Sequence, residues 1–292
     1  MEKINQFTTY LAVEKNSSPS TIMEYKSDLL GFKKFIDNKN LLLADKTHIR
    51  AFLEYLKNQK KHSPKTIQRK IATLRSFYKF CLREDYIPKN PMDYIQNQKI
   101  EKKLPVFLTE QEANKIIQAA FASSHTVRGK RDHAMILLFL STGLRISELA
   151  NLSLSDITIY SDKDFTIKVR GKGNKERIIP LMGRAKDALE TWIKHKPSSA
   201  CQKIFINIPG LKQLTNRGIQ RTIKKYAEQA GIEKKISPHK LRHTFATNLL
   251  RNQADIVSIQ ELLGHESLNT TRIYMHVTPI DKRRAIMKLG YN

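Results

Sequence analysis

The sequence predicts a mainly α-helical chain in two domains, with a small β-hairpin in the second domain. Its 292 residues exceed the ~100–200 that are usual for one domain. Over residues 1–96, apolar side chains recur at spacings of three and four, as one helical face requires. Only around residues 165–181 does this pattern give way to two short β-branched runs on either side of a glycine-rich turn. The second domain is therefore expected to be α+β.

The first domain, residues 1–96, is expected to be a bundle of four helices. The opening helix covers about residues 3–15, and a second helix follows Ser20. Thr47 is a candidate N-cap for the third helix. Ser63 and Pro64 mark the start of the fourth, because a capping serine is followed there by proline at the first helical position.

The apolar pattern lapses over residues 97–105, which predicts an exposed linker before a second domain at 106–292. That domain opens with the capping box Thr109-Glu110-Gln111-Glu112. The elements expected after it are a helix around residues 132–140 with a turn at 141–143, strands at 165–170 and 177–181 around the tip 171–175, and further helices that include 240–251 and 255–263.

The charge of the chain points to a polyanionic partner. It has 52 Lys and Arg against 27 Asp and Glu, a net charge of +25. Residues 1–105 carry +10 and residues 106–292 carry +15, so both predicted domains are basic. Such an excess argues against a neutral metabolic enzyme and leaves nucleic acid or an anionic membrane surface as candidates. Two basic domains on a linker could close around a duplex, whereas the alternative is a uniformly solvated basic surface.

The cysteines and apolar runs indicate the cellular compartment. Cys81 and Cys201 are far apart and outside any CxxC pattern, which disfavours a disulfide scaffold or a thiolate zinc site. The N-terminus lacks a secretory pattern, and the longest apolar run, 134–140, is far short of the ~20 residues of a membrane span. We therefore expect a soluble cytoplasmic protein without a membrane partner.

Taken singly, the chemically interesting residues have ordinary explanations. Arg145 after a glycine turn can be a surface or capping arginine, and Lys172 at a hairpin tip can be merely solvated. His239 and His243 have an i,i+4 spacing that could hold a metal, but the glutamate of an HExxH motif is missing between them. Tyr274 could belong to a core.

Five motifs in a fixed order are more specific. They are Thr-Gly-Leu-Arg-Ile-Ser-Glu-Leu at 142–149, Gly-Lys-Gly-Asn-Lys at 171–175, His-Lys-Leu-Arg-His-Thr at 239–244, Leu-Leu-Gly-His at 262–265 and Tyr-Met-His at 274–276. In these motifs the chain resembles the tyrosine recombinase (phage integrase) family, and within it most of all the Xer-type site-specific recombinases. The resemblance implies a helical N-terminal core-binding domain that binds DNA, followed by a tyrosine recombinase catalytic domain.

The resemblance also implies a reaction, a transesterification that uses no metal and no cofactor. Tyr274 would attack a backbone phosphate, leaving a 3′-phosphotyrosyl link and a free 5′-hydroxyl, and strands would be exchanged through a Holliday junction. The other implied roles are phosphate binding by Arg145 and Arg242, proton transfer by His239, general acid catalysis by Lys172, a later histidine at His265 and a supporting carboxylate at Glu148.

Elementary chemistry accounts for these residue types. A phosphodiester under attack gathers negative charge on its non-bridging oxygens, and a planar guanidinium donates to two of them at once. A tyrosine hydroxyl has a pKa of ~10, so attack at neutral pH needs a base or a strongly positive site. The 5′-oxygen needs a proton as it leaves, and a flexible lysine can supply it.

Further basic residues are candidates for holding double-stranded DNA, although solvated helix faces would look the same. They are Lys65, Arg69 and Arg75 on one helix and Arg217, Arg221, Lys224 and Lys225 on another. The family resemblance also implies a homo-tetramer on two DNA sites, with the tail 279–292 docking on the neighbouring protomer; folding back in cis is the alternative. A second recombinase or a DNA translocase is a possible further partner.

The leading interpretation is a site-specific DNA recombinase that resolves chromosome dimers and associates with the nucleoid. A compact mobile-element integrase is an alternative, although no extra N-terminal arm-binding domain is evident. A type IB topoisomerase-like enzyme and a non-catalytic DNA-binding accessory protein remain the other candidates.

Overall fold

The computed structural model describes residues 1–97, 106–159, 165–171 and 175–264. The chain divides into two compact units, Met1–Lys102 and Lys103–Asn292. Each unit has a hydrophobic core of its own. The two units are therefore described separately.

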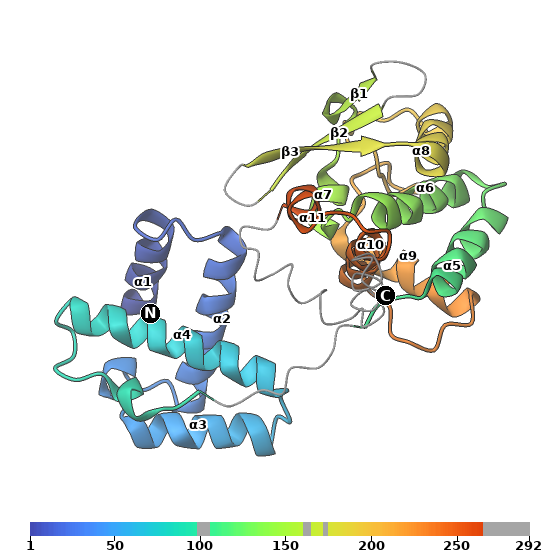
Figure 1. Ribbon diagram of the computed structural model, residues 1–292. Coiled ribbons are helices and arrows are strands. Elements are labelled where there is room, and N and C mark those ends of the chain that lie inside the picture. Colours follow the sequence, from blue (N-terminus) through green and yellow to red (C-terminus); the bar gives the residue numbers. More distant parts are fainter. Residues whose placement is uncertain (98–105, 160–164, 172–174, 265–292) are drawn as a thin grey trace, which may run out of the picture. The chain divides into compact units, whose positions relative to one another are not determined.

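The described part of the first unit is a bundle of four α-helices, as the sequence predicts (Figure 1). Phe7, Phe32, Phe77 and Tyr78 are fully buried at its centre. The elements are α1 (Glu2–Val13), α2 (Pro19–Phe35), α3 (Lys46–Asn58) and α4 (Pro64–Arg83), with 3₁₀ turns at Leu41–Leu43 and Pro91–Tyr94.

The start of α4 is confirmed, whereas two predicted helix starts were wrong. Helix α2 is capped by Ser18 rather than Ser20, and its first residue is Pro19, so it repeats the serine-proline start of α4. Helix α3 is capped by Asp45 rather than Thr47, because the Asp45 carboxylate accepts hydrogen bonds from the amides of both Thr47 and His48.

The second unit combines helices with one small sheet (Figure 1). Helix α6 is central in it, since it contacts α5, α8, α10 and β3. The elements are α5 (Glu110–Ala122), α6 (Val127–Thr142), α7 (Ile146–Asn151), a 3₁₀ turn at Leu154–Asp156, β1 (Ile157–Ile159), β2 (Phe165–Arg170), β3 (Glu176–Leu181), α8 (Gly183–His195), α9 (Asn216–Gln229), α10 (Pro238–Arg251) and α11 (Ile256–Leu263).

The sheet is antiparallel with the order β1-β2-β3, so the predicted hairpin gains a third strand. Strands β2 and β3 pair from Phe165 opposite Leu181 to Arg170 opposite Glu176. Strand β1 has only three residues, too few for an alternating pattern to stand out in the sequence. Pro180 is tolerated because β3 lies at the edge of the sheet.

Two predicted helix boundaries in this unit were also wrong. Helix α6 begins at Val127 and includes Ser141 and Thr142, so only Gly143 leaves the helix, with a φ of 60°. Helix α10 begins at Pro238, which places His239 in its first turn rather than before the helix. Among the residues of the described ranges, no helix is long and apolar enough to span a bilayer.

Candidate active site

The site begins where α6 ends. At Gly143 the backbone takes a φ of +60°, and a Cβ there would lie 2.4 Å from the Phe245 ring and 2.9 Å from a Leu263 methyl group. Only glycine fits this close approach. The turn directs the Gly143 carbonyl to α10, where it accepts a 2.6 Å hydrogen bond from Nη1 of Arg242. Two residues later, Arg145 is the N-cap residue of α7.

Glu148 fixes Arg145 in two ways. Its Oε2 accepts a hydrogen bond from the backbone amide of Arg145 at 2.7 Å, and its Oε1 accepts one from Nη1 of Arg145 at 2.7 Å. The Glu148 side chain is only 3% exposed. Burial raises the pKa of Glu148, but Arg177 and Arg145 more than offset this and hold the pKa below its usual value. Glu148 is therefore an ionised partner of Arg145.

Arg177 is part of this cluster and was missed in the sequence. From strand β3, its Nη1 and Nη2 donate to the two Glu148 oxygens at 3.0 and 2.7 Å, and its Nε donates to the Leu262 carbonyl at 2.9 Å. A signal was present, because Arg177 shares the inward-facing positions of β3 with Ile179 and Leu181. An arginine in such a position needs a buried acceptor.

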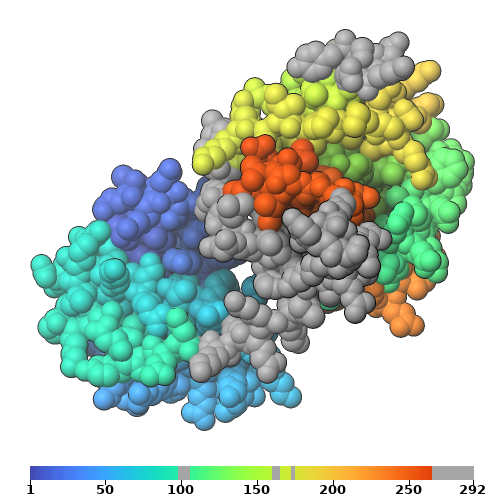
Figure 2. All heavy atoms as spheres, viewed as in Figure 1, coloured from blue at the N-terminus to red at the C-terminus, as the bar shows by residue number. Residues whose placement is uncertain are grey.

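The end of α11 joins these arginines. Three consecutive backbone carbonyls each accept a hydrogen bond from a different guanidinium. The Leu262 carbonyl accepts from Arg177, the Leu263 carbonyl from Arg242 at 2.5 Å, and the Gly264 carbonyl from Arg145 at 2.8 Å. Carbonyls at a helix C-terminus lack partners inside the helix and attract cations. The guanidiniums of Arg145 and Arg242 are thus both held at the end of α11, on the carbonyls of two successive residues. Figure 2 shows orange-red atoms of α10 and α11 at the surface beside the yellow strands, and α11 contacts β3.

Helix α10 brings a histidine to the same region. His239 is exposed and lies three residues before Arg242, which is itself only 3% exposed. The rings of His239 and His243 are 4.3 Å apart in an edge-on arrangement. Burial, followed by the charges of His239 and Arg242, lowers the pKa of His243 to about 4. Across the described segments, no group of three or more His, Cys, Asp or Glu could hold a metal ion, so the pair gains no further ligand there.

Lys172, His265 and Tyr274 lie outside the described residues, as does the tail 279–292. The chain neighbours of the first two are described. A Cβ on Gly171 would lie 4.0 Å from Nη1 of Arg145, and one on Gly264 would lie 3.1 Å from Nη1 of Arg177. The residues next to Lys172 and His265 therefore lie against the arginine cluster.

The candidate DNA-binding residues of α4 differ in their partners. Lys65 is exposed. Arg69 donates to the buried carboxylate of Asp28 at 2.5 Å, and Arg75 donates to the Ile95 carbonyl at 2.8 Å. Arg69 and Arg75 thus have a structural task in the first unit that the sequence did not indicate.

The candidates on α9 all face solvent. Arg217, Arg221, Lys224 and Lys225 are exposed, and Lys224 has an ion pair with Glu228 at 3.5 Å on the helix surface. Exposed pairs of this kind hold a side chain only weakly. The cations of α9 are therefore available to a ligand.

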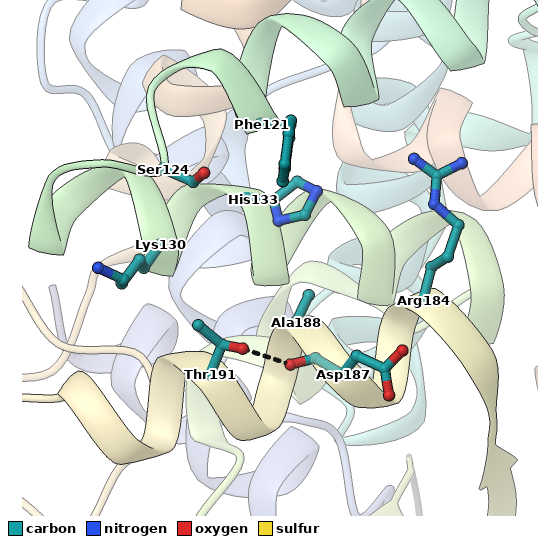
Figure 3. Close-up of a pocket in the computed structure, with 8 residues that line it drawn as sticks. All are labelled: Phe121, Ser124, Lys130, His133, Arg184, Asp187, Ala188 and Thr191. Carbon is teal, nitrogen blue, oxygen red and sulfur yellow. Dashed lines mark hydrogen bonds between the residues drawn. The ribbon is translucent and has the colours of Figure 1, made fainter.

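A hollow of about 380 Å³ lies between α5, α6 and α8 (Figure 3). Phe121 and the partly buried His133 lie against one another on one side of it, with ring centroids 5.3 Å apart. On its α8 side, Thr191 donates to the Asp187 carbonyl at 2.8 Å. Among the residues that the structure describes, no predicted catalytic residue lines this hollow, so it is separate from the arginine cluster.

Comparison with known proteins agrees with this geometry. The phage integrase family matches residues 106–280, and the N-terminal SAM-like domain of phage integrases matches residues 4–85. Tyrosine recombinase XerC of Oceanobacillus iheyensis is 43% identical over 295 residues, covering 98% of this chain and 94% of the relative. Tyrosine recombinase XerC of Listeria monocytogenes is 38% identical, covering 97% and 95%.

Solved structures show the same fold. The XerH site-specific recombinase, bound to a palindromic difH substrate after cleavage, has a TM-score of 0.77 and 25% identity, covering 97% of this chain and 84% of XerH. A lambda integrase tetramer on a Holliday junction has a TM-score of 0.74 at 21% identity, covering 94% and 76%. With the family matching more than half of the chain and XerC relatives matching nearly all of it, this protein belongs to the phage integrase family, the tyrosine recombinases, and is of the Xer type.

Proposed function

We propose that this enzyme performs site-specific recombination by cutting and rejoining DNA strands at the cluster around Arg145 and Arg242. The observation that carries the proposal is the convergence of both guanidiniums on the end of α11, with Glu148 fixing one of them. Two cations fixed at one helix end match the charge that a phosphodiester develops under attack. Because their partners already hold them in place, little reorganisation is needed when the phosphate binds.

The covalent chemistry is assigned to residues next to this cluster. Tyr274 attacks the scissile phosphate and forms the 3′-phosphotyrosyl bond, while His239 helps to move the phenolic proton. Lys172 protonates the leaving 5′-oxygen, and His265 joins the phosphate pocket. The adjacent positions of Gly171 and Gly264 support the assignments of Lys172 and His265. The phosphotyrosyl bond conserves the energy of the phosphodiester, so rejoining needs no cofactor.

At larger scale, the substrate is double-stranded DNA with specific recombination sites. We assign residues 1–96 to core binding, 97–105 to a linker and 106–292 to catalysis. The exposed cations Lys65, Arg217, Arg221, Lys224 and Lys225 bind the backbone, and the arginines that have internal partners shape the surface. Four protomers assemble on two sites, with the tail 279–292 docking on a neighbour.

The cellular task that fits best is the resolution of chromosome dimers at cell division, in the cytoplasm at the nucleoid. The XerC relatives, which match over nearly the full chain, favour this role over that of a mobile-element integrase. A second recombinase or a DNA translocase is a partner that this task would call for. A topoisomerase-like or a non-catalytic role lacks such support.

The test is capture of the covalent intermediate. We expect the protein to form a covalent complex on a nicked suicide duplex that carries a candidate chromosomal site, both with and without EDTA. Tyr274→Phe removes the nucleophile and should abolish the complex while DNA binding in a gel-shift assay persists. Tyr226→Phe is the control, because Tyr226 is a fully buried tyrosine of α9.

Two results would contradict the proposal. A covalent complex that survives in Tyr274→Phe would reject the nucleophile. Loss of cleavage on chelation would reject the metal-independent reaction.

A further inference from the structure

We propose that Arg177 is a positioning residue for strand cleavage, which fixes the Glu148 carboxylate and the end of α11 at once and so orients Arg145. The inference rests on the proposed function. Arg177 comes from β3, whereas Glu148 belongs to α7 and Leu262 to α11. One side chain therefore ties together three elements that surround the phosphate site.

The first tie is to Glu148, whose two oxygens each accept from both arginines. Oε1 accepts from Nη1 of Arg145 at 2.7 Å and from Nη1 of Arg177 at 3.0 Å. Oε2 accepts from the Arg145 amide at 2.7 Å and from Nη2 of Arg177 at 2.7 Å. A carboxylate held by a bidentate arginine has one orientation. Without Arg177, the partner that fixes the Arg145 guanidinium could rotate.

The second tie is to the end of α11. Nε of Arg177 donates to the Leu262 carbonyl at 2.9 Å. Gly264, the next residue after the helix, has a φ of +61°. It lies close to the guanidinium of Arg177, since a Cβ at this position would be 3.1 Å from Nη1 of Arg177. The guanidinium and this glycine thus set the point at which the chain leaves α11, one residue before His265 and ten before Tyr274.

Exposure separates the tasks of the two arginines. The side chain of Arg145 is 37% exposed, whereas that of Arg177 is 11% exposed. Arg145 is accessible to a substrate. Arg177, in contrast, donates hydrogen bonds from Nε, Nη1 and Nη2 to three internal acceptors. A lysine has a single nitrogen and cannot reproduce this geometry. Arg177 therefore acts through Glu148 and α11, without touching the phosphate.

The pH profile distinguishes positioning from simple support of the fold. Burial raises the pKa of Glu148, and Arg177 contributes most to lowering it. In Arg177→Gln, Arg145 is the remaining arginine that lowers the pKa of Glu148 against the effect of burial, so this pKa rises. As the pH falls, Glu148 then becomes protonated and releases Arg145. The other charged groups that line the hollow beside Glu148 are Asp156, Lys168, Arg170 and Lys203. All of them are retained in the variant.

The experiment measures single-turnover formation of the covalent complex on the nicked suicide duplex from pH 5.5 to 8.5. We expect Arg177→Gln to slow cleavage by about 10–100-fold, as a displacement of a catalytic group by about 1 Å does. DNA affinity should stay within about threefold, since a positioning residue affects the rate more than binding. The loss should be greatest at low pH. Arg177→Lys should recover part of the rate, because it pairs with Glu148 but cannot also hold Leu262.

Two control variants separate charge and stability from positioning. Arg184→Gln removes one exposed positive charge from α8 of the same unit, and Ile179→Val weakens the core two residues along β3. Both should keep the wild-type rate and pH profile. In a double-mutant cycle, the combined defect of Arg177→Gln and Glu148→Gln should be smaller than the product of the single defects, because the contact with Glu148 is common to both and only the contact with Leu262 is lost in addition.

The inference is overturned if the wild type cleaves and Arg177→Gln matches its rate and pH profile, or if the defects of Arg177→Gln and Glu148→Gln simply multiply. Should Arg177→Gln fail to fold, a wild-type profile in Arg177→Lys overturns it equally. If the wild-type protein forms no complex on any site, the proposed function fails and the inference fails with it.

Discussion

At the residue scale, the candidate site depends on how its arginines are held. Among the described residues, Arg145, Arg177 and Arg242 donate hydrogen bonds to the backbone carbonyls of Gly143, Leu262, Leu263 and Gly264. Arg145 and Arg177 also share the carboxylate of Glu148. Two guanidiniums on one carboxylate leave a positive excess at this pair, which an approaching phosphate can neutralise.

His243 predicts a pH dependence of stability in the catalytic unit. Its pKa is about 4 in the folded protein, while an unfolded histidine has a pKa of about 6.5. Above pH 6.5 it is neutral in both states. Between pH 6.5 and 4 the unfolded chain takes up a proton that the folded protein does not. The free energy of unfolding should therefore fall as pH falls, by roughly 1–3 kcal/mol once partial solvent screening is allowed for.

Urea unfolding at pH 7.5, 6.5, 5.5 and 4.5 would measure this effect. His243→Asn should flatten the slope between pH 6.5 and 4.5. His195→Asn removes an exposed histidine at the end of α8 and should leave the slope unchanged. An identical slope in wild type and His243→Asn would reject the assignment.

At the element scale, two left-handed glycines shape the site at helix ends. Gly143 ends α6 with a φ of +60°, and Gly264 ends α11 with a φ of +61°. Each presents its carbonyl to an arginine of the candidate site, Gly143 to Arg242 and Gly264 to Arg145. The helix ends, rather than the helix faces, therefore position the guanidiniums.

Gly143→Ala should be strongly destabilising and should also impair cleavage. The left-handed conformation costs an alanine about 1–2 kcal/mol. A Cβ would in addition approach Phe245 to 2.4 Å and Leu263 to 2.9 Å, so both side chains must move. We expect a total loss of about 2–4 kcal/mol in urea unfolding, as for other overpacked sites. The displaced carbonyl should weaken its hold on Arg242 and slow covalent-complex formation.

Gly231→Ala is the matched control for this substitution. Gly231 has a similar φ of +67°, but nothing lies within 4 Å of its Cβ position. In Gly231→Ala the free energy of unfolding should fall only by the cost of the left-handed conformation, about 1–2 kcal/mol, and DNA cleavage should be normal. Equal losses in the two variants would show that the close contact at Gly143 has no effect.

At the scale of the whole molecule, the net charge of +25 serves two tasks in the proposed reaction. A few cations meet one scissile phosphate, and the exposed lysines and arginines of both units hold the backbone around it. Of the candidates on α4, Arg69 and Arg75 have internal partners, whereas Lys65 is exposed. We therefore expect Lys65 to contribute more to DNA binding than either arginine, and the contact surface to be smaller than the charge count indicates.

DNA binding should weaken steeply with salt. A protein that neutralises about 6–10 phosphates loses roughly 10³–10⁵-fold in affinity between about 50 and 200 mM salt. Fluorescence anisotropy with a labelled duplex would give the slope of log K against log salt. Lys65→Gln and Arg221→Gln should each reduce the slope by about one, whereas Lys194→Gln, on the exposed side of α8, should not. A nearly flat salt response would contradict this division of the charge.

The amino-acid sequence by itself determined the helical class, the hairpin, several helix starts and the family. These features are local: apolar spacing, a capping box at Thr109 and short ordered motifs can all be recognised within a few residues. Where prediction failed, a neighbouring residue was the better cap, as with Asp45, or the strand was too short to show a pattern, as with β1.

Only the tertiary structure decided how the site is held together. Arg242 reaches a carbonyl 99 residues away and Arg177 one 85 residues away, so no local pattern could indicate either partner. The same holds for the task of Asp28 in binding Arg69, 41 residues along the chain. The residue type alone determines the charge of a side chain. Its partner depends on which backbone groups the folded chain leaves without hydrogen bonds, and that is settled only when α7, β3, α10 and α11 meet.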